Sequence, residues 1–197
     1  IVYASSSSVY GPQSFYGECP VTEDAPLAPQ MVYSAGKVCT ELAADRYIDD
    51  HGMDIRGLRP GNVLGHGRSS GVAGFMGPFI SEPALGRPVN VPFRPMSASP
   101  MIYVDDIAEY FVRIAYTENL NYRIYNAGGP SHTLDDIHKI LLRALPRAEV
   151  TFGDLESKGL RLMSNERIEK ETGYVAPPLE QRVLAQINEA QQLSPLT

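Results

Sequence analysis

A tyrosine and a lysine four residues apart, Tyr33 and Lys37, form the pair in this sequence best suited to catalysis. Residues at positions i and i+4 of a helix lie on one face, so the ammonium group of Lys37 can lie beside the phenol of Tyr33. A free tyrosine titrates near pH ~10 and transfers protons poorly at neutral pH. A neighbouring cation favours the phenolate and so moves the tyrosine pKa toward neutral pH, as general acid–base catalysis requires.

The serine run Ser5–Ser8 adds hydroxyl groups that can orient a substrate hydroxyl or carbonyl. A hydroxyl, a phenol and an ammonium together suit the movement of a proton while a cofactor takes or gives a hydride. Each signal is weak alone, because a solvated tyrosine–lysine helix pair contributes roughly a few tenths of a kcal/mol and occurs often. Four serines in a row are equally typical of a flexible loop. Order and spacing must therefore carry the inference.

Composition excludes several classes of protein. The 197 residues carry a formal charge of −6, which argues against nucleic acid as a partner because phosphate binding needs basic patches. No apolar run reaches ~18 residues, so no membrane span is expected, and the first residues do not resemble a signal peptide. We interpret Cys19 and Cys39 as reduced thiols of a cytoplasmic protein, and no Cys/His cluster has the spacing of metal ligands.

The order of predicted elements favours an α/β layered sheet. A helix is predicted from about Met31 to His51, with an apolar stripe of Val38, Leu42, Ala43 and Tyr47, and Gly52 marks its end. Asp105 is a candidate N-cap, and Thr133 with Asp136 resembles a capping box. Pro-rich residues 11–29 predict a loop, and 152–174 is less regular. The other predictions are strands at 1–4, 54–58, 89–91, 102–104 and 123–126, and helices at 72–85, 105–115, 133–145 and 179–192.

A longer succession carries a resemblance to a known family. A strand is followed by Ser-Ser-Ser-Ser-Val-Tyr-Gly, a Pro-rich loop, Tyr-x-x-x-Lys on a helix, another strand, and Arg-Pro-Gly-Asn-Val-Leu-Gly. This succession resembles the extended short-chain dehydrogenase/reductase family of NAD-dependent epimerases and dehydratases, which also includes threonine dehydrogenases. The resemblance is clear from Ile1 to about Gly129 and loose beyond.

The resemblance implies a fold and a division of the chain. The fold is the C-terminal part of a Rossmann-like doubly wound parallel sheet plus a smaller α/β substrate-binding region. Residues 1–65 are expected to be the remainder of the dinucleotide-binding domain and 66–100 a substrate-side insertion. Residues 101–130 are expected to return to the Rossmann sheet, and 131–197 to form the C-terminal substrate-binding region.

The same resemblance implies roles by position. Tyr33 corresponds to the catalytic acid/base, Ser6 to the catalytic serine or threonine, and Lys37 to the residue that favours the phenolate and bonds the nicotinamide ribose. The cofactor is expected to contact Tyr33, Lys37, Pro60, Gly61 and Val63. Ser7, Ser8, Asn62, Met101 and Tyr103 are expected to bind substrate. A structural reading remains for several of these, since alternate serines can satisfy backbone groups and Asn62 can cap a turn.

The cofactor itself, NAD or NADP, cannot be chosen from this sequence. The family's Gly-rich turn precedes the serine strand, and no such turn occurs there. Gly71-Val72-Ala73-Gly74-Phe75-Met76-Gly77 has glycines at similar spacing, but it follows the Tyr/Lys helix with no strand before it, so we interpret it as coincidence. We therefore expect the chain to be the C-terminal part of a longer enzyme.

The sequence also bears on substrate and partners. Relatives that act on nucleotide sugars commonly carry Arg-Asp where this chain has Ser99-Pro100, which argues against a nucleotide sugar. A hydroxy acid, an amino acid or a sugar derivative is expected, converted by dehydrogenase, epimerase or dehydratase chemistry at a secondary alcohol or ketone carbon. The alternative is a non-catalytic dinucleotide-binding or interaction protein of the same fold. The family resemblance implies a homodimer in which the helix bearing the Tyr/Lys pair often takes part. The exposed side of 40–47 could form this interface, or it could be a plain solvent-exposed face.

Overall fold

The computed structural model describes residues 1–193, which form two compact units. Unit 1 comprises residues 1–62, 99–131 and 158–176. Of the described residues, 63–98, 132–157 and 177–193 form unit 2. The chain first passes from unit 1 to unit 2 between Asn62 and Val63, and the functional division expected at residue 65 stays a prediction. Residues 158–176 return to unit 1, whereas the sequence grouped them with the rest of the C-terminal region.

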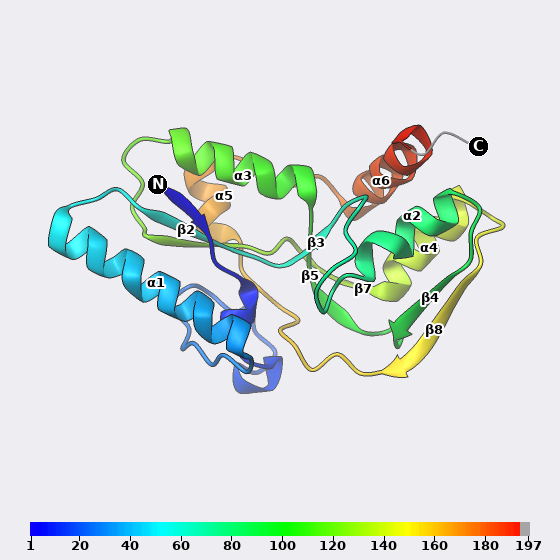
Figure 1. Ribbon diagram of the computed structural model, residues 1–197, viewed down its shortest axis with the longest axis horizontal. Helices are drawn as coiled ribbons and strands as arrows, with labels where there is room; N and C mark the ends of the chain where they lie inside the picture. Colours follow the sequence, from blue (N-terminus) through cyan, green and yellow to red (C-terminus); the bar gives the residue numbers. More distant parts are fainter. Residues whose placement is uncertain (194–197) are drawn as a thin grey trace. The chain divides into compact units, whose positions relative to one another are not determined.

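Unit 1 is built on a parallel sheet in the order β1-β2-β6. Its strands are β1 (Val2–Ala4), β2 (Arg56–Pro60) and β6 (Ile124–Ala127). Helix α3 (Val104–Tyr116) packs against β1 and β2, and α5 (Glu166–Thr172) packs against β6. In Figure 1, α1 (Val32–His51) and α3 lie on opposite sides of these strands. Parallel strands with helices on both faces are the doubly wound arrangement.

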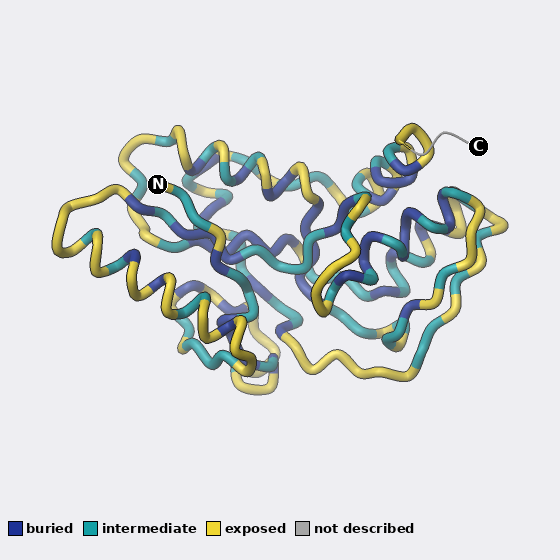
Figure 2. Tube along the Cα trace, in the orientation of Figure 1, coloured by how far each residue is buried: buried dark blue, intermediate teal, exposed yellow. Residues whose placement is uncertain are grey.

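Helix α1 has the predicted ends, but most of its apolar stripe is exposed: Val38 packs against the core cluster around Val9 and Tyr10, whereas the other three members are exposed. Gly52 ends the helix in the left-handed conformation at φ 63°, as its position predicted. Leu42 and Tyr47 are 60% and 54% exposed, and Figure 2 shows exposed residues along much of the helix. The residues of α1 that are buried are Ser34, Glu41 and Ala44. The helix therefore presents mainly small and polar side chains to unit 1.

Helix α3 begins differently from the prediction. Strand β5 (Ala98–Tyr103) runs directly into it, so the extended Tyr103 is the N-cap and the assignment of Asp105 as N-cap was wrong. Asp105 lies in the first turn, where a carboxylate is favoured by the helix dipole. Asp106 is buried and accepts a 2.5 Å hydrogen bond from the hydroxyl of Tyr174.

Two short 3-10 helices follow the first strand, and the chain forms a further three-stranded sheet. The 3-10 helices are η1 (Ser7–Val9) and η2 (Gln13–Phe15), and η2 falls within the predicted loop. The further sheet has the order β3-β5-β7, with β3 at Asn62–Leu64 and β7 at Ser131–Thr133. Helix α5 lies within the segment that the sequence left irregular.

Unit 2 contains three helices and a two-stranded parallel sheet. Helix α2 (Met76–Ala84) packs against α4 (Leu134–Ala144), α6 (Leu179–Leu193) and β4 (Val89–Phe93), which pairs with β8 (Val150–Leu155). The capping box of α4 is confirmed: the Thr133 hydroxyl accepts from the Asp136 amide, and the Asp136 carboxylate accepts from the Thr133 amide. Strand β8 was not predicted. None of the helices within 1–193 is long and apolar enough to cross a membrane.

Candidate active site

The first two turns of α1 bring Tyr33 and Lys37 together. The Lys37 ammonium lies 5.6 Å from the centroid of the Tyr33 ring, and it donates a 2.6 Å hydrogen bond to the Ala4 carbonyl at the end of β1. This bond ties the lysine to the strand that leads into the serine run. The Tyr33 side chain remains 58% exposed. The predicted pair therefore has the expected proximity, with the tyrosine open to a ligand.

Ser6 lies where β1 ends and η1 begins, as the N-cap of η1. Its hydroxyl oxygen accepts from the Ser8 amide at 3.2 Å and from the Ser8 hydroxyl at 2.9 Å. A serine hydroxyl has one proton to donate besides its acceptor sites, so the Ser6 proton can still be directed to a substrate oxygen. Ser7 is half-buried in η1. Ser8, expected to bind substrate, here directs its own hydroxyl at Ser6.

The turn after β2 requires glycine for a reason found within unit 1. A Cβ atom on Gly61 would lie 2.5 Å from the carbonyl oxygen of Gly128 and 2.8 Å from that of Pro100. Only glycine permits this approach of backbones. Pro60 ends β2, Asn62 begins β3, and Val63 belongs to unit 2. The contacts of these residues with a cofactor or substrate stay a prediction.

Met101 and Tyr103 lie on β5, and each is 3% exposed. Both were expected to bind substrate, and both are buried. Ser99, which stands where many nucleotide-sugar enzymes carry the arginine, is also buried in β5. Their roles toward a substrate stay predictions.

A buried ion pair between Glu41 of α1 and Arg59 of β2 was not predicted from the sequence. The guanidinium of Arg59 donates to both carboxylate oxygens of Glu41, at 2.9 and 2.6 Å, and the two side chains are 4% and 9% exposed. Glu41 also accepts from the Ser5 hydroxyl, and Arg59 donates to the Tyr10 hydroxyl at 2.5 Å. One signal was present, since Glu41 follows Lys37 by one helical turn and Arg59 directly precedes Pro60.

The protonation states of this cluster are fixed by burial and pairing. Burial lowers the pKa of Arg59, but the hydrogen bonds to Glu41 and the neighbouring oxygens outweigh it, so the net pKa is raised and the group stays charged. Burial raises the pKa of Tyr10 to about 12, although Arg59 opposes the shift. Tyr10 therefore remains a neutral hydroxyl, which accepts from Arg59 and donates to the Asn126 side chain at 2.9 Å.

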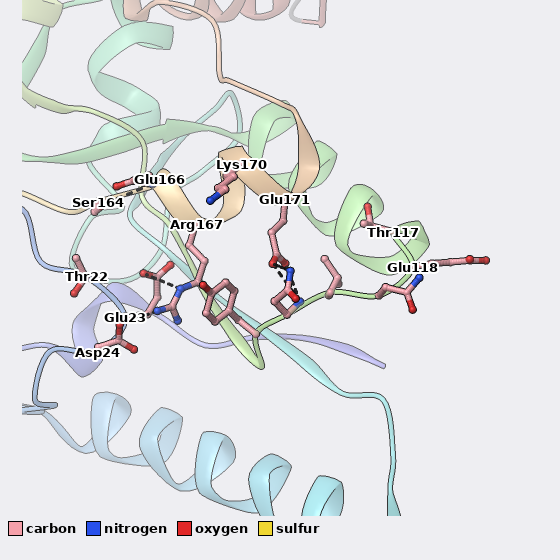
Figure 3. A pocket seen from close by; sticks show the side chains of 14 residues that line it. Thr22, Glu23, Asp24, Thr117, Glu118, Ser164, Glu166, Arg167, Lys170 and Glu171 are labelled. Atoms are coloured by element: carbon pink, nitrogen blue, oxygen red, sulfur yellow. Dashed lines mark hydrogen bonds and ion pairs between the residues drawn. The ribbon is translucent and has the colours of Figure 1, made fainter.

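A polar cavity of about 410 Å³ lies elsewhere in unit 1 (Figure 3). Arg167 lies in its wall, with its guanidinium 3.9 Å from the centroid of the Tyr122 ring and ion pairs to Asp24 at 2.8 Å and Glu23 at 3.6 Å. Burial raises the pKa of Glu23, while the Asn126 amide, which donates to its carboxylate at 2.8 Å, opposes that rise. None of the sequence-predicted site residues lines this cavity.

The site and fold agree with the family that the sequence resembles. The model of the NAD dependent epimerase/dehydratase family matches residues 1–128, which is well over half of the chain. The chain therefore belongs to this family. The matched residues include both segments that carry Ser6, Tyr33 and Lys37.

Curated relatives include both epimerases and dehydrogenases. UDP-glucose 4-epimerase of Mycolicibacterium smegmatis is 32% identical over 115 residues, which are 57% of this chain and 36% of the relative. Mitochondrial L-threonine 3-dehydrogenase of Bos taurus is 27% identical over 128 residues, which are 65% of this chain and 34% of the relative. The matches thus span about a third of the length of these two relatives.

Solved structures confirm the Rossmann-like α/β fold predicted from the sequence. The GalE-like L-threonine dehydrogenase from Cupriavidus necator superposes with a TM-score of 0.84 at 19% identity, covering 96% of this chain and 65% of that one. UDP-N-acetylglucosamine 4-epimerase from Methanobrevibacter ruminantium M1 superposes with a TM-score of 0.83 at 22% identity, covering 98% and 63%. At these identities the likeness concerns the fold.

Proposed function

We propose that the protein containing this chain is an NAD-dependent oxidoreductase that acts at a secondary alcohol or ketone carbon. The observation that carries the proposal is the position of Lys37, whose ammonium is bonded to the Ala4 carbonyl and lies 5.6 Å from the Tyr33 ring. The family match over 1–128 supports the same chemistry.

The donor set of the site fits a nicotinamide cofactor. Lys37 directs one N–H at the Ala4 carbonyl, which leaves two N–H donors of the ammonium for the hydroxyls of a ribose. The exposed Tyr33 phenol is a further partner on the same helix face. When bound, NAD supplies the carbon that accepts or returns a hydride. The sequence left NAD and NADP open, and the family match favours NAD.

The side chains of this chain handle the proton. Tyr33 acts as the general base that takes the proton of the substrate hydroxyl and returns it in the reverse direction, with the Lys37 ammonium 5.6 Å from the centroid of its ring. Ser6 donates its remaining proton to the same substrate oxygen, which orients the substrate toward Tyr33. Lys37 holds the ring and the cofactor ribose.

We further propose a small hydroxy compound, such as a β-hydroxy amino acid, as substrate, with release of the ketone. Two observations support this over a nucleotide sugar. The position that holds an arginine in many nucleotide-sugar enzymes is the buried Ser99. L-Threonine 3-dehydrogenase is among the curated relatives. NADH formation from L-threonine and epimerisation of UDP-sugars, the latter followed by product analysis because it yields no net NADH, are compared at matched concentrations with the full-length protein. Faster turnover of UDP-sugars would contradict this choice.

Substitution Tyr33→Phe in the full-length protein tests the proposed reaction. General acid–base catalysis contributes about 10²- to 10⁴-fold, so kcat/KM is expected to fall by at least about 100-fold. The thermal midpoint is expected to stay the same because the side chain is 58% exposed. Tyr47→Phe is the matched control, since Tyr47 lies on the same helix and is 54% exposed. Unchanged turnover of Tyr33→Phe would refute the proposed reaction.

A further inference from the structure

The burial of two charged residues, Glu41 and Arg59, is not explained by stability alone. Both side chains are buried, and removal of two charges from water offsets most of what their attraction contributes, so a well-packed apolar pair is often as stable. A buried pair of this kind is weak evidence of a stabilising role. What the pair does possess is fixed geometry, because the fork of the guanidinium meets both carboxylate oxygens.

Two partners of the pair are the two ends of the turn that carries Ser6, and Arg59 also donates to the Glu23 carbonyl at 3.3 Å. Glu41 accepts from the hydroxyl of Ser5, immediately before Ser6, and Arg59 donates to the hydroxyl of Tyr10, immediately after η1. The Arg59 guanidinium also lies 4.9 Å from the centroid of the Tyr10 ring. The segment that contains Ser6 and Ser8 is thus held at both ends by one ion pair.

The same pair joins the other segments of the candidate site. Glu41 lies one turn beyond Lys37 on α1, and the residue after Arg59 is Pro60, where the turn expected to meet the cofactor begins. Neither charged group is accessible to a ligand, since both are nearly fully buried. Any effect on the reaction must therefore pass through the residues that they hold.

From these contacts we infer that Glu41 and Arg59 are positioning residues that hold the Ser6 turn in register with Tyr33 and Lys37. The inference rests on the proposed function. A misplacement of about 1 Å can cost about 100-fold in rate, so loss of the pair acts on kcat more than on KM. Because both side chains are nearly fully buried, we expect the pair to contribute little to binding energy directly.

The principal test replaces the pair by apolar side chains in the full-length protein. Glu41→Leu with Arg59→Met removes both charges together, and so leaves no unpaired buried charge. We expect kcat to fall about 10- to 100-fold while KM and the NAD dissociation constant, measured by fluorescence titration, change less than about threefold. The matched control is Arg46→Met with Asp50→Leu, an exposed ion pair on the same helix, for which kcat is expected to stay unchanged.

A coupling measurement separates positioning from a merely structural role. Ser6→Ala is introduced into the wild type and into the apolar-pair variant, and the two losses in kcat are compared. We expect Ser6→Ala to cost much less in the apolar-pair variant, because the hydroxyl is already misplaced there. Equal losses in the two backgrounds would overturn the inference.

Ser5→Ala serves as the second, milder variant. It removes one hydrogen bond to Glu41 and leaves the ion pair intact, so folding is retained even where the double substitution unfolds the protein. We expect kcat to fall about three- to tenfold with KM and the thermal midpoint unchanged. An unchanged kcat would refute the positioning role. Tyr33→Phe is assayed in parallel to separate the two proposals. If Tyr33→Phe does not lower turnover, the proposed function is refuted. If Tyr33→Phe lowers turnover but Ser5→Ala has normal kinetics, only the positioning role is refuted.

Discussion

Lys37 has three N–H donors, and the carbonyl of Ala4 takes one of them at 2.6 Å. That carbonyl belongs to the last residue of β1, so the lysine is anchored to the strand that delivers Ser6. At the scale of single residues, the site therefore contains Lys37, which is hydrogen-bonded to the backbone, and Tyr33, which is exposed. Its third member is Ser6, whose hydroxyl oxygen accepts a hydrogen bond from the Ser8 hydroxyl. Each group retains a property that the proposed reaction needs: Lys37 has N–H donors left for a ribose, Tyr33 is accessible, and Ser6 has a proton to donate to the substrate oxygen.

The Lys37 ammonium can be tested directly by Lys37→Met, which preserves much of the aliphatic stem. We expect kcat/KM to fall by at least about 100-fold and NAD binding to weaken, because the ammonium beside the Tyr33 ring and its donors for the ribose are both lost. Turnover and NAD titration of the full-length protein measure the two effects. Arg46→Met removes an exposed charge on the same helix and is expected to be silent; a silent Lys37→Met would contradict the proposed site.

At the scale of elements, local chemistry fixes where helices begin and end. The Asp136 carboxylate accepts from the amide and the hydroxyl of Thr133, both at 2.8 Å, at the start of α4. The hydrogen bond from the Thr133 backbone is the main reason that the pKa of Asp136 is lowered, although partial burial opposes it. The cap therefore depends on the ionised form of this carboxyl group.

A lowered pKa predicts an acid-sensitive contribution to stability. The contribution is complete above the unfolded value of about 3.9 and is lost as pH falls through the lower value of the folded state. We expect Asp136→Asn to lose stability at neutral pH and to show a shallower decline below about pH 4. Urea unfolding followed at several pH values measures this. Asp135→Asn, in the same turn but paired with Lys139, is the control; an identical acid limb in Asp136→Asn and wild type would rule the prediction out.

At the scale of the whole molecule, the outer face of α1 stands out. Val32, Leu42 and Tyr47 are 91%, 60% and 54% exposed, although all three are apolar or aromatic. Apolar side chains gathered on one helix face are a common feature of subunit interfaces. The family resemblance places a homodimer interface on the helix that bears the tyrosine and lysine, and the exposure of this face supports that proposal.

Leu42→Glu tests the dimer. A charge at the centre of an apolar interface is costly to bury, so we expect the full-length protein to shift from dimer to monomer in analytical ultracentrifugation. Val175→Glu is the control, because Val175 is an equally exposed apolar residue, at 67%, in unit 1 but outside α1. A wild-type protein that sediments as a monomer would contradict the proposal outright.

The sequence by itself determined what depends on near neighbours. The i and i+4 spacing placed Tyr33 and Lys37 on one face, Gly52 ended α1 because it adopts positive φ, and Thr133 with Asp136 set the start of α4. These features involve residues within about one helical turn, so the local sequence suffices to specify them. The order of such elements was enough to predict the fold class.

Only the tertiary structure decided which residues meet across the chain. Glu41 finds Ser5 at a separation of 36 residues and Arg59 at 18, and no local pattern distinguishes these partners from other charged or polar residues. The same holds for α1, whose stripe of Val38, Leu42, Ala43 and Tyr47 suggested a packed face. Of these four, Val38 packs against the core, whereas the fully buried residues of the helix are Ser34, Glu41 and Ala44. Which face of a helix is buried depends on the segments that pack against it. The segments that pack against α1 carry the Ser5 hydroxyl and the Arg59 guanidinium. Both are hydrogen-bond donors, and therefore the residue of α1 buried against them is the carboxylate Glu41.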